Sequence, residues 1–141
     1  MKEQRLIKVI GTQRDAQGEE NKIELVTEGN YYRKKDSLYL VYEESEISGM
    51  EGATTTLKIE GEKKVSMRRF GSTVSQLIFE EGKNFTSQYS TQYGNFEMKI
   101  LTKKLYIEIG DGSKNGSIEI YYDVRITGLA NTSNELKVEF M

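Results

Sequence analysis

Hydrophobic and polar residues alternate along most of this 141-residue chain, in short runs separated by clusters of glycine, asparagine, aspartate and serine. An alternation with a period of two places apolar side chains on one face of a β-strand and polar side chains on the other. The clearest run lies in residues 117–127, where Ile118 and Ile120 share one face and Glu119 points to the opposite one. This pattern predicts an antiparallel all-β protein with little or no helix.

The same runs define the strands that we expect. They are Leu6–Arg14, Lys22–Tyr32, Ser37–Glu44, Thr54–Glu60, Lys64–Phe70, Ser75–Glu80, Phe85–Tyr93, Gly94–Leu101, Lys104–Ile109, Ser117–Thr127 and Glu135–Phe140. One window also supports a helix, because its apolar residues Met67, Phe70, Val74 and Leu77 fall at helical intervals. The Gly-Ser-Thr sequence at residues 71–73 interrupts that window and favours two strands joined by a turn.

Strands in this number, without helices, form either a β-sandwich or a closed barrel. The chain has no proline, a residue that commonly protects the exposed edge of a sheet from pairing with other molecules. Closure of the sheet removes such edges altogether. We therefore expect residues 1–141 to form one domain, a closed antiparallel β-barrel.

The composition excludes most familiar catalytic chemistry. The chain has no cysteine and no histidine, so it offers no thiolate nucleophile, no imidazole base and no Cys or His ligands for zinc. The adjacent carboxylates Glu43 and Glu44 point to opposite faces of a strand and cannot act together as an acid–base pair. We expect a protein that is not an enzyme and holds neither a metal nor a cofactor.

The segment GDGSKNG, at residues 110–116, resembles two kinds of ligand-binding loop without matching either. As a phosphate-binding loop it lacks the final Lys-Ser/Thr, and it precedes a strand rather than a helix. As a calcium loop it has Tyr122 at the twelfth position, where an acid is required. The segment therefore predicts a hairpin turn.

The charges nearly balance, with 20 Lys and Arg residues against 22 Asp and Glu residues and a net charge of −2. The best candidate for stacking on nucleic acid is YYRKK at Tyr31–Lys35, but acidic runs at 43–46 and 80–81 oppose it, so we expect no nucleic-acid partner. No apolar run approaches the length of a membrane span, and the N-terminus lacks the apolar core of a signal peptide. These features predict a cytoplasmic location without membrane insertion.

Several polar side chains are expected to point into the barrel. Arg69 shares a strand face with Val65 and Met67, whereas Arg68 lies on the opposite face. The same reasoning predicts further inward polar side chains at Tyr42, Glu44, Ser87, Tyr89, Thr91 and Tyr122, with Tyr93 on the face of Tyr89. An unpaired guanidinium away from water is too unfavourable to persist, so Arg69 requires a partner.

Two interpretations of Arg69 remain open. In the first, its partner is Glu44 or a ring of backbone carbonyl oxygens, and the group is a structural plug at one end of the barrel. In the second, Arg69 binds the carboxylate or phosphate of a small ligand in the lumen, and Glu44 sets the geometry of the guanidinium. The ligand is then oriented by tyrosine hydroxyls, those of Tyr42, Tyr89 and Tyr122.

The order of the motifs resembles that of the YwiB-like family of small bacterial proteins. In this chain the order runs EGNYYRKK, LYLVYEES, TTLKIEG, VSMRRFG, LIFEEGK, YSTQYGNFEMKILTKKL and GSIEIYYDV, from about Leu6 to Phe140. The resemblance implies a calycin-type barrel, similar in fold to the lipocalins and fatty-acid-binding proteins, in a bacterial cytosol and without an assigned activity. The Gly-x-Trp signature of secreted lipocalins is absent, because the chain has no tryptophan.

In the fatty-acid-binding proteins, an arginine and a tyrosine inside the barrel hold the ligand carboxylate. By this analogy of fold, Arg69 with Tyr42 or Tyr89 takes that part. We therefore expect a barrel that binds a small anionic or amphipathic molecule without catalysis. The alternative is a solidly packed barrel that acts through its outer surface, as a protein-interaction module or a homodimer. A lumen filled by Met67, Phe96, Met98 and Tyr122 favours this alternative, and an open lumen that reaches Arg69 favours ligand binding.

Overall fold

The computed structural model describes residues 3–44, 52–71, 74–110, 115–128 and 130–141; the side chains of residues 89–91 and 130 lie outside this description. The described residues form strands and no helix. In chain order the strands are β1 (Glu3–Asp15), β2 (Glu20–Lys34), β3 (Ser37–Glu43), β4 (Thr54–Glu60), β5 (Lys64–Phe70), β6 (Ser75–Glu80), β7 (Asn84–Thr91), β8 (Gly94–Ile109), β9 (Gly116–Ile126) and β10 (Ala130–Phe140).

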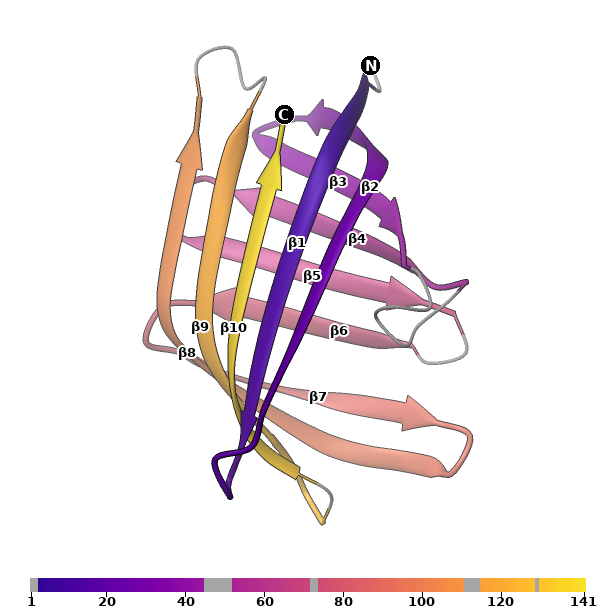
Figure 1. The fold of residues 1–141 in the computed structure, drawn as a ribbon, viewed down its shortest axis with the longest axis vertical. Helices are drawn as coiled ribbons and strands as arrows, with labels where there is room; N and C mark the ends of the chain where they lie inside the picture. Colours follow the sequence, from indigo (N-terminus) through magenta and orange to yellow (C-terminus); the bar gives the residue numbers. More distant parts are fainter. Residues whose placement is uncertain (1–2, 45–51, 72–73, 111–114, 129) are drawn as a thin grey trace.

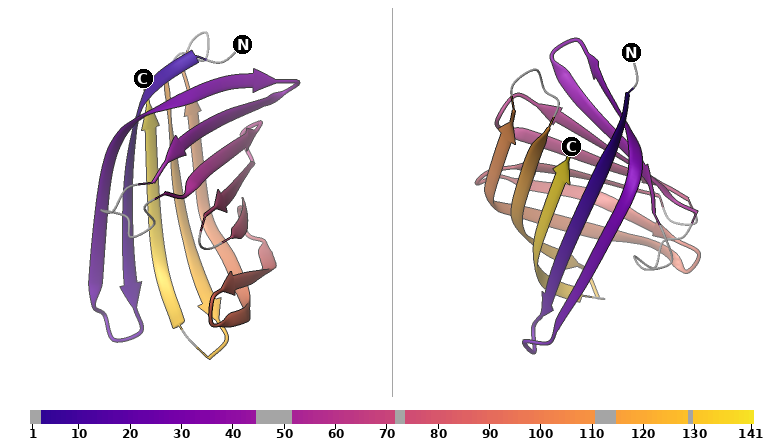
Figure 2. Two further views of the ribbon diagram at one scale, coloured as in Figure 1. Left: turned by 90° about the vertical axis from the view of Figure 1, so that its right-hand side faces the viewer. Right: turned by 45° about the horizontal axis from the view of Figure 1, so that its top comes forward.

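All ten strands belong to one antiparallel sheet, in the order β6-β5-β4-β3-β2-β1-β10-β9-β8-β7. The first and last strands pair in the middle of the sheet, so the two ends of the chain lie close together (Figure 1). The sheet curls round on itself (Figure 2), and its edge strands β6 and β7 contact each other without a shared ladder in the described part of the chain. The prediction of an all-β barrel is confirmed, and the barrel is nearly closed.

Three of the expected strands have the bounds that the sequence predicts, namely β4, β5 and β6. The helical alternative for residues 67–77 is wrong, because Met67 and Leu77 are directly opposed partners on β5 and β6. The remaining strands are present, and several extend further than expected. The ends of β1, β2 and β10 are polar, so they carry no apolar alternation that would mark them as strands.

Residues 94–109, which we expect to form two strands, form the single strand β8 (Figure 1). Its register against β9 shifts between Thr102 and Lys104, which is a β-bulge. The N–H of Thr102 donates to the carbonyl of Lys83 at 3.3 Å, and its carbonyl accepts from the N–H of Gly82 at 2.8 Å. The extra residue at the bulge shifts the alternation of apolar and polar residues by one position. The sequence of this continuous strand therefore resembles that of two separate strands.

The core lies inside the curled sheet, and its residues come from the apolar faces that the alternation predicts. Ile118 and Ile120 of β9 are buried, as are Leu57 and Ile59 of β4. In the described part of the chain, the buried apolar residues are Ile7, Leu25, Tyr31, Leu38, Leu40, Tyr42, Ala53, Leu57, Ile59, Val65, Met67, Leu77, Phe79, Met98, Ile100, Leu105, Ile118, Ile120, Leu136, Val138 and Phe140. Burial of this apolar surface is the main contribution to the stability of the barrel.

Two segments singled out by the sequence have structural roles. In YYRKK, Tyr31 is buried and stacks on Phe140 with ring centroids 5.7 Å apart, so its ring faces the core and not the solvent. The GDGSKNG segment closes the β8–β9 hairpin, because the N–H of Gly110 donates to the carbonyl of Asn115 at 2.8 Å. Residues 111–114 lie outside the described part. No helix in the described ranges is long and apolar enough to span a membrane.

Gly29 of β2 lies at a position where β3 leaves no room for a side chain. A Cβ atom built on Gly29 would lie 2.6 Å from the carbonyl oxygen of Val41 and 3.2 Å from the Cβ of Tyr42, and it would also clash with Cδ1 of Ile7. The backbone carbonyl cannot move without disturbing the β2–β3 ladder. Gly29 therefore allows β3, which carries Tyr42, to pack at this distance.

Gly29→Ala is expected to lower the free energy of unfolding by about 1–3 kcal/mol, because the added methyl group overpacks this contact. Urea denaturation monitored by circular dichroism measures the change. Gly11→Ala in β1 is the matched control, since a Cβ at Gly11 meets no atom within 4 Å. The control should change the stability by no more than about 0.5 kcal/mol. Equal effects of the two substitutions would contradict this assignment.

Candidate functional site

Polar side chains form a row across the inner face at one end of the barrel. Tyr42 of β3 is opposite Thr55 of β4, which is opposite Arg69 of β5, which is opposite Ser75 of β6. Glu44 directly follows β3 and is buried beside this row. We call these five residues the polar cluster. The register of three ladders places them together, although they are spread over 34 positions of the sequence, from 42 to 75.

Glu44 is held at the end of β3 by a backbone hydrogen bond from its N–H to the carbonyl of Ala53, at 2.8 Å. This bond continues the β3–β4 pairing by one step and keeps the Glu44 side chain on the inner face. The side chain is only 4% exposed. Its Oε1 accepts a hydrogen bond of 2.7 Å from the hydroxyl of Thr55, which is completely buried. A carboxylate in such a place requires donors or a cation.

Arg69 supplies the cation. Its Nε lies 3.8 Å from Oε1 of Glu44, which is an ion pair but is too long for a hydrogen bond. The Nε is buried and has no hydrogen-bond partner among the described residues. The side chain as a whole is 23% exposed, so its accessible surface lies away from Nε. Arg69 therefore has one buried donor that is unused and a part that solvent can reach.

Tyr42 carries the second unused donor. Its side chain is 2% exposed, and its hydroxyl is buried without a hydrogen-bond partner in the described part of the structure. Burial raises the pKa of Tyr42 strongly, and the Glu44 carboxylate raises it further through its charge and its closeness to the hydroxyl. The positive charge of Arg69 and the nearby hydroxyl of Thr55 lower the pKa of Tyr42. The hydroxyl is therefore protonated at neutral pH and can donate a hydrogen bond.

Tyr122 of β9 reaches the cluster from the other side of the barrel. Its ring packs against Phe79 with centroids 4.7 Å apart. Burial raises the pKa of Tyr122, and Arg69 lowers it, so the tyrosine lies within the electrostatic range of the guanidinium. Tyr122 is half-buried and faces the interior, as its alternation with Ile118 and Ile120 predicts.

The structure thus brings together Tyr42, Glu44 and Arg69, with Tyr122 nearby, from the residues that the sequence predicts. Tyr89 is opposite Phe96 in the β7–β8 ladder, but its side chain lies outside the described part. The side chain of Thr91 is likewise outside it, and Ser87 is half-buried.

The prediction that Tyr93 faces inward is wrong: β7 ends at Thr91, and Tyr93 lies in the following turn with 83% of its surface exposed.

Sequence reasoning missed two members of the cluster, Thr55 and Ser75. Thr55 lies two residues before the buried Leu57 and four residues before the buried Ile59, so the alternation within β4 does place it on the inner face. The signal was overlooked because threonine is common in strands for its shape alone. Ser75 likewise shares a face with the buried Leu77 and Phe79, so the alternation within β6 also places it inward, opposite to the exposed Val74 that precedes it.

The functional groups of the polar cluster are of three kinds. The cluster holds one carboxylate, one guanidinium and hydroxyl groups, so Glu44 has no second carboxylate in the cluster with which it could share a proton. No group of three or more Asp, Glu, His or Cys residues in the described ranges is arranged to hold a metal ion.

The interior beside the cluster is largely filled. Met67 and Met98 are buried in the core. Four grooves with volumes of about 320 to 520 Å³ are lined by residues outside the polar cluster.

Comparison with known proteins is consistent with this fold and assigns no activity. The chain is 29% identical, over 110 residues, to the uncharacterized beta-barrel protein YwiB of Bacillus subtilis (strain 168); the alignment covers 77% of this chain and 73% of the relative. The crystal structure of the ywiB protein from Bacillus subtilis matches with a TM-score of 0.82 at 23% identity, over 99% of this chain and 91% of that chain. The resemblance to the YwiB-like family is thereby confirmed.

A family model matches residues 7–138, which is nearly the whole chain. That model describes a domain of unknown function, so it supports the fold and the relationship but gives no substrate, partner or reaction. The chain belongs to the DUF1934 family.

Proposed function

We propose that this barrel binds a small anionic or amphipathic molecule at the polar cluster, without catalysing a reaction on it. One observation carries the proposal: the Nε of Arg69 and the hydroxyl of Tyr42 are buried close to Glu44, and neither makes a well-formed hydrogen bond among the described residues. A buried donor without a partner costs about 1–3 kcal/mol, and few persist in natural proteins. A ligand oxygen that accepts from one or both would remove this cost.

The chemistry of the donors indicates the class of ligand. Both groups donate, so the ligand must present acceptor atoms, and a carboxylate or phosphate is the acceptor that a guanidinium binds best. Glu44 neutralises part of the positive charge of Arg69 from the inner side. The exposed part of Arg69 remains available to an anion that approaches from the end of the barrel.

The next row of inner residues accounts for the amphipathic part of the proposal. Leu40, Leu57, Met67 and Leu77 are opposed to one another on β3 to β6, two residues away from the members of the polar cluster. A ligand with a charged group on the cluster would place its hydrocarbon part against this apolar row. Methionine is flexible and adapts to such a contact more readily than branched residues do, so Met67 is the side chain expected to move.

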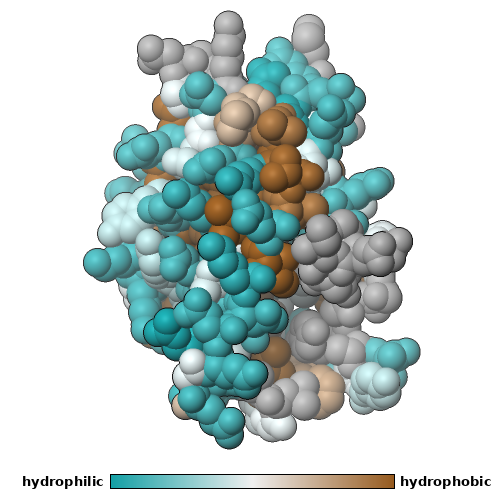
Figure 3. Space-filling model, in the orientation of Figure 1, coloured by the Kyte–Doolittle hydropathy of each residue, from teal (hydrophilic) through white to brown (hydrophobic). Residues whose placement is uncertain are grey.

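A second candidate function rests on the filled interior. With Met67 and Met98 buried, the barrel can act as a packed unit whose outer surface makes the contacts. That surface is mainly hydrophilic in the view of Figure 3, with an apolar strip. Leu6 and Val26, on the outer faces of β1 and β2, are 43% and 55% exposed. A homodimer formed through such apolar residues is the alternative to ligand binding.

Native mass spectrometry of the protein, purified from a bacterial host without delipidation, tests the proposal first. We expect a bound molecule of a few hundred daltons that is lost in Arg69→Met. Arg68→Met is the matched control, because Arg68 is the next residue, points outward and stacks over Phe70 at 4.9 Å. The control should retain the bound molecule. A bare mass for the unmodified protein, accompanied by a dimer, would favour the second candidate.

A double-mutant cycle on ligand-free protein separates ligand binding from a purely structural role of Arg69. Because Arg69 and Glu44 are 3.8 Å apart without a hydrogen bond, we expect Arg69→Met to lower the free energy of unfolding by only about 1–2 kcal/mol. Removing one partner of a tightly bonded buried pair costs about 3–5 kcal/mol. A loss in that higher range, largely recovered in Arg69→Met/Glu44→Gln, would identify the structural plug instead.

Tyr42→Phe tests whether the hydroxyl is unused in the free protein. At neutral pH we expect the unfolding free energy to stay the same or to rise by up to about 1–3 kcal/mol, because the substitution removes a buried donor that lacks a partner in the folded state. In the unmodified protein the pKa of Tyr42 is raised above the value of about 10 in the unfolded chain. Above this pH the unfolded state loses the proton and the folded state keeps it, so stability falls as pH rises.

Tyr42→Phe should therefore weaken the alkaline loss of stability, measured by urea denaturation between neutral and strongly alkaline pH. Tyr93→Phe is the control at an exposed position and should leave the pH dependence unchanged. A large loss of stability at neutral pH in Tyr42→Phe would show that the hydroxyl has a structural partner, against the proposal.

A further inference from the structure

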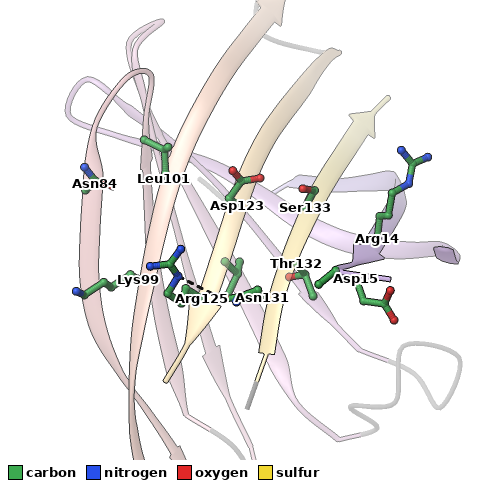
Figure 4. Close-up of a pocket in the computed structure, with 12 residues that line it drawn as sticks. Arg14, Asp15, Asn84, Lys99, Leu101, Asp123, Arg125, Asn131, Thr132 and Ser133 are labelled. Atoms are coloured by element: carbon green, nitrogen blue, oxygen red, sulfur yellow. Dashed lines mark hydrogen bonds between the residues drawn. The ribbon is translucent and has the colours of Figure 1, made fainter. Parts of the chain in front are cut away.

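A groove of about 410 Å³ lies on the outer face of the sheet, across β7 to β10 and the end of β1 (Figure 4). We call it the outer groove. Its side chains come from the faces opposite to the core: Asp123 and Arg125 of β9 alternate with the inward Tyr122 and Val124. The sheet itself therefore separates this groove from the polar cluster.

Two neighbouring cross-strand rows form the floor of the outer groove. In the first row, Lys99 is opposite Arg125, and Arg125 is opposite Asn131. In the second row, Leu101 is opposite Asp123, which is opposite a serine on β10. The rows are two residues apart along each strand, which is about 7 Å. A small molecule can therefore contact both rows at once.

The first row places two positive charges directly opposite each other. Like charges at opposed positions of an antiparallel pair destabilise the sheet. Neither charge is well neutralised: Nε of Arg125 donates to the side-chain oxygen of Asn131, a neutral group, at 3.2 Å, and Nζ of Lys99 lies 3.8 Å from Glu97. Among the described residues no carboxylate forms an ion pair with Arg125. An anion between Lys99 and Arg125 would relieve the repulsion.

The acids of the groove are already engaged with other partners and do not neutralise this pair. Oδ1 of Asp15 accepts hydrogen bonds from the N–H groups of Gln17 and Glu19, both at 2.9 Å. Oδ2 of Asp123 lies 3.2 Å from Nζ of Lys103. The other oxygen of Asp123 is buried and has no hydrogen-bond partner in the described structure. The second row thus offers one acceptor that lacks a donor.

We propose that the outer groove binds a small molecule that carries one anionic group and several hydroxyl groups, such as a sugar phosphate. The phosphate lies between Lys99 and Arg125, and a hydroxyl donates to the carboxylate of Asp123, whose side chain must turn to expose its buried oxygen. Arg125 is a suitable phosphate ligand because its planar guanidinium can keep the bond to Asn131 while its remaining N–H groups bind the anion. Leu101, which is 36% exposed, provides an apolar surface for the carbon skeleton between the two polar groups.

Titration of the ¹⁵N-labelled protein, followed by NMR, tests this site with three probes: glucose 6-phosphate, inorganic phosphate and glucose. We expect glucose 6-phosphate to bind with a dissociation constant of about 1 mM or tighter. Inorganic phosphate should bind more weakly, and glucose should not bind. The amide signals that move should be those of residues 99, 101, 123 and 125. An absence of shifts at these residues with every probe would overturn the proposal.

Three variants assign the contacts. Lys99→Gln and Arg125→Gln should each weaken glucose 6-phosphate binding about tenfold or more, since each removes a charged hydrogen bond. Asp123→Asn should reduce the preference for glucose 6-phosphate over inorganic phosphate. Lys137→Gln is the matched control on the same outer face, where Lys137 already lies 3.6 Å from both Glu119 and Glu139. Equal weakening in the control would show unspecific attraction and overturn the site.

The phosphate could also belong to a lipid headgroup. Co-sedimentation with vesicles that contain phosphatidic acid distinguishes the two sources. Binding to these vesicles, without binding of glucose 6-phosphate, would overturn the assignment to a soluble sugar phosphate. Arg69→Met distinguishes the outer groove from the polar cluster. This variant should leave the binding of glucose 6-phosphate to the outer groove unchanged.

Discussion

The pairing of β1 with β10 is the constraint on which the rest of this barrel depends. It joins the strands β2 to β6 on one side with β7 to β9 on the other, so that ten strands share one curled surface. Ile7 is opposite Phe140 in this ladder, and both are buried. Because side chains alternate along every strand, a shift of this ladder by one residue would exchange its inner and outer residues. The apolar residues on the inner face therefore set the register.

The same register has a second consequence for the polar residues. An inward position at the end of one strand becomes the neighbour of inward positions at the ends of the next strands, and this is how Tyr42, Thr55 and Arg69 meet. Glu44 is tolerated there because Thr55 donates to it and Arg69 lies beside it. The arrangement leaves donors unused at the end of an apolar interior, and such donors are unfavourable unless another molecule accepts from them.

The outer face of the sheet has the same cross-strand register, but its charged side chains are exposed to solvent. Solvent reduces the energy of each charge pair, so opposed cations such as Lys99 and Arg125 can persist there without unfolding the sheet. At the inner cluster, where the Glu44 side chain is almost fully buried, a charge without a partner is far less favourable. The two sites that we propose therefore differ in kind. The inner one depends on buried donors that lack well-formed hydrogen bonds, and the outer one depends on two opposed positive charges that are only weakly neutralised.

The sequence by itself determined the all-β class, most strands and the inward direction of Arg69, Tyr42, Glu44 and Tyr122. These features depend on alternation within a single strand, which is a local property that the residues display directly. The sequence did not show that residues 94–109 form one strand, because the bulge at Thr102 depends on hydrogen bonds to Gly82 and Lys83 in another segment.

Only the tertiary structure decided which inward residues meet. Thr55 and Ser75 join the polar cluster through the β4–β5 and β5–β6 ladders, and Lys99 lies opposite Arg125 in the β8–β9 ladder. The register of such a ladder cannot be predicted from the sequence of either strand alone. Register is settled by the packing of the whole core, because the apolar faces of all strands must be buried together. The face of the sheet to which a side chain points can thus be predicted from its own strand, whereas the residues that it meets depend on the packing of the whole sheet.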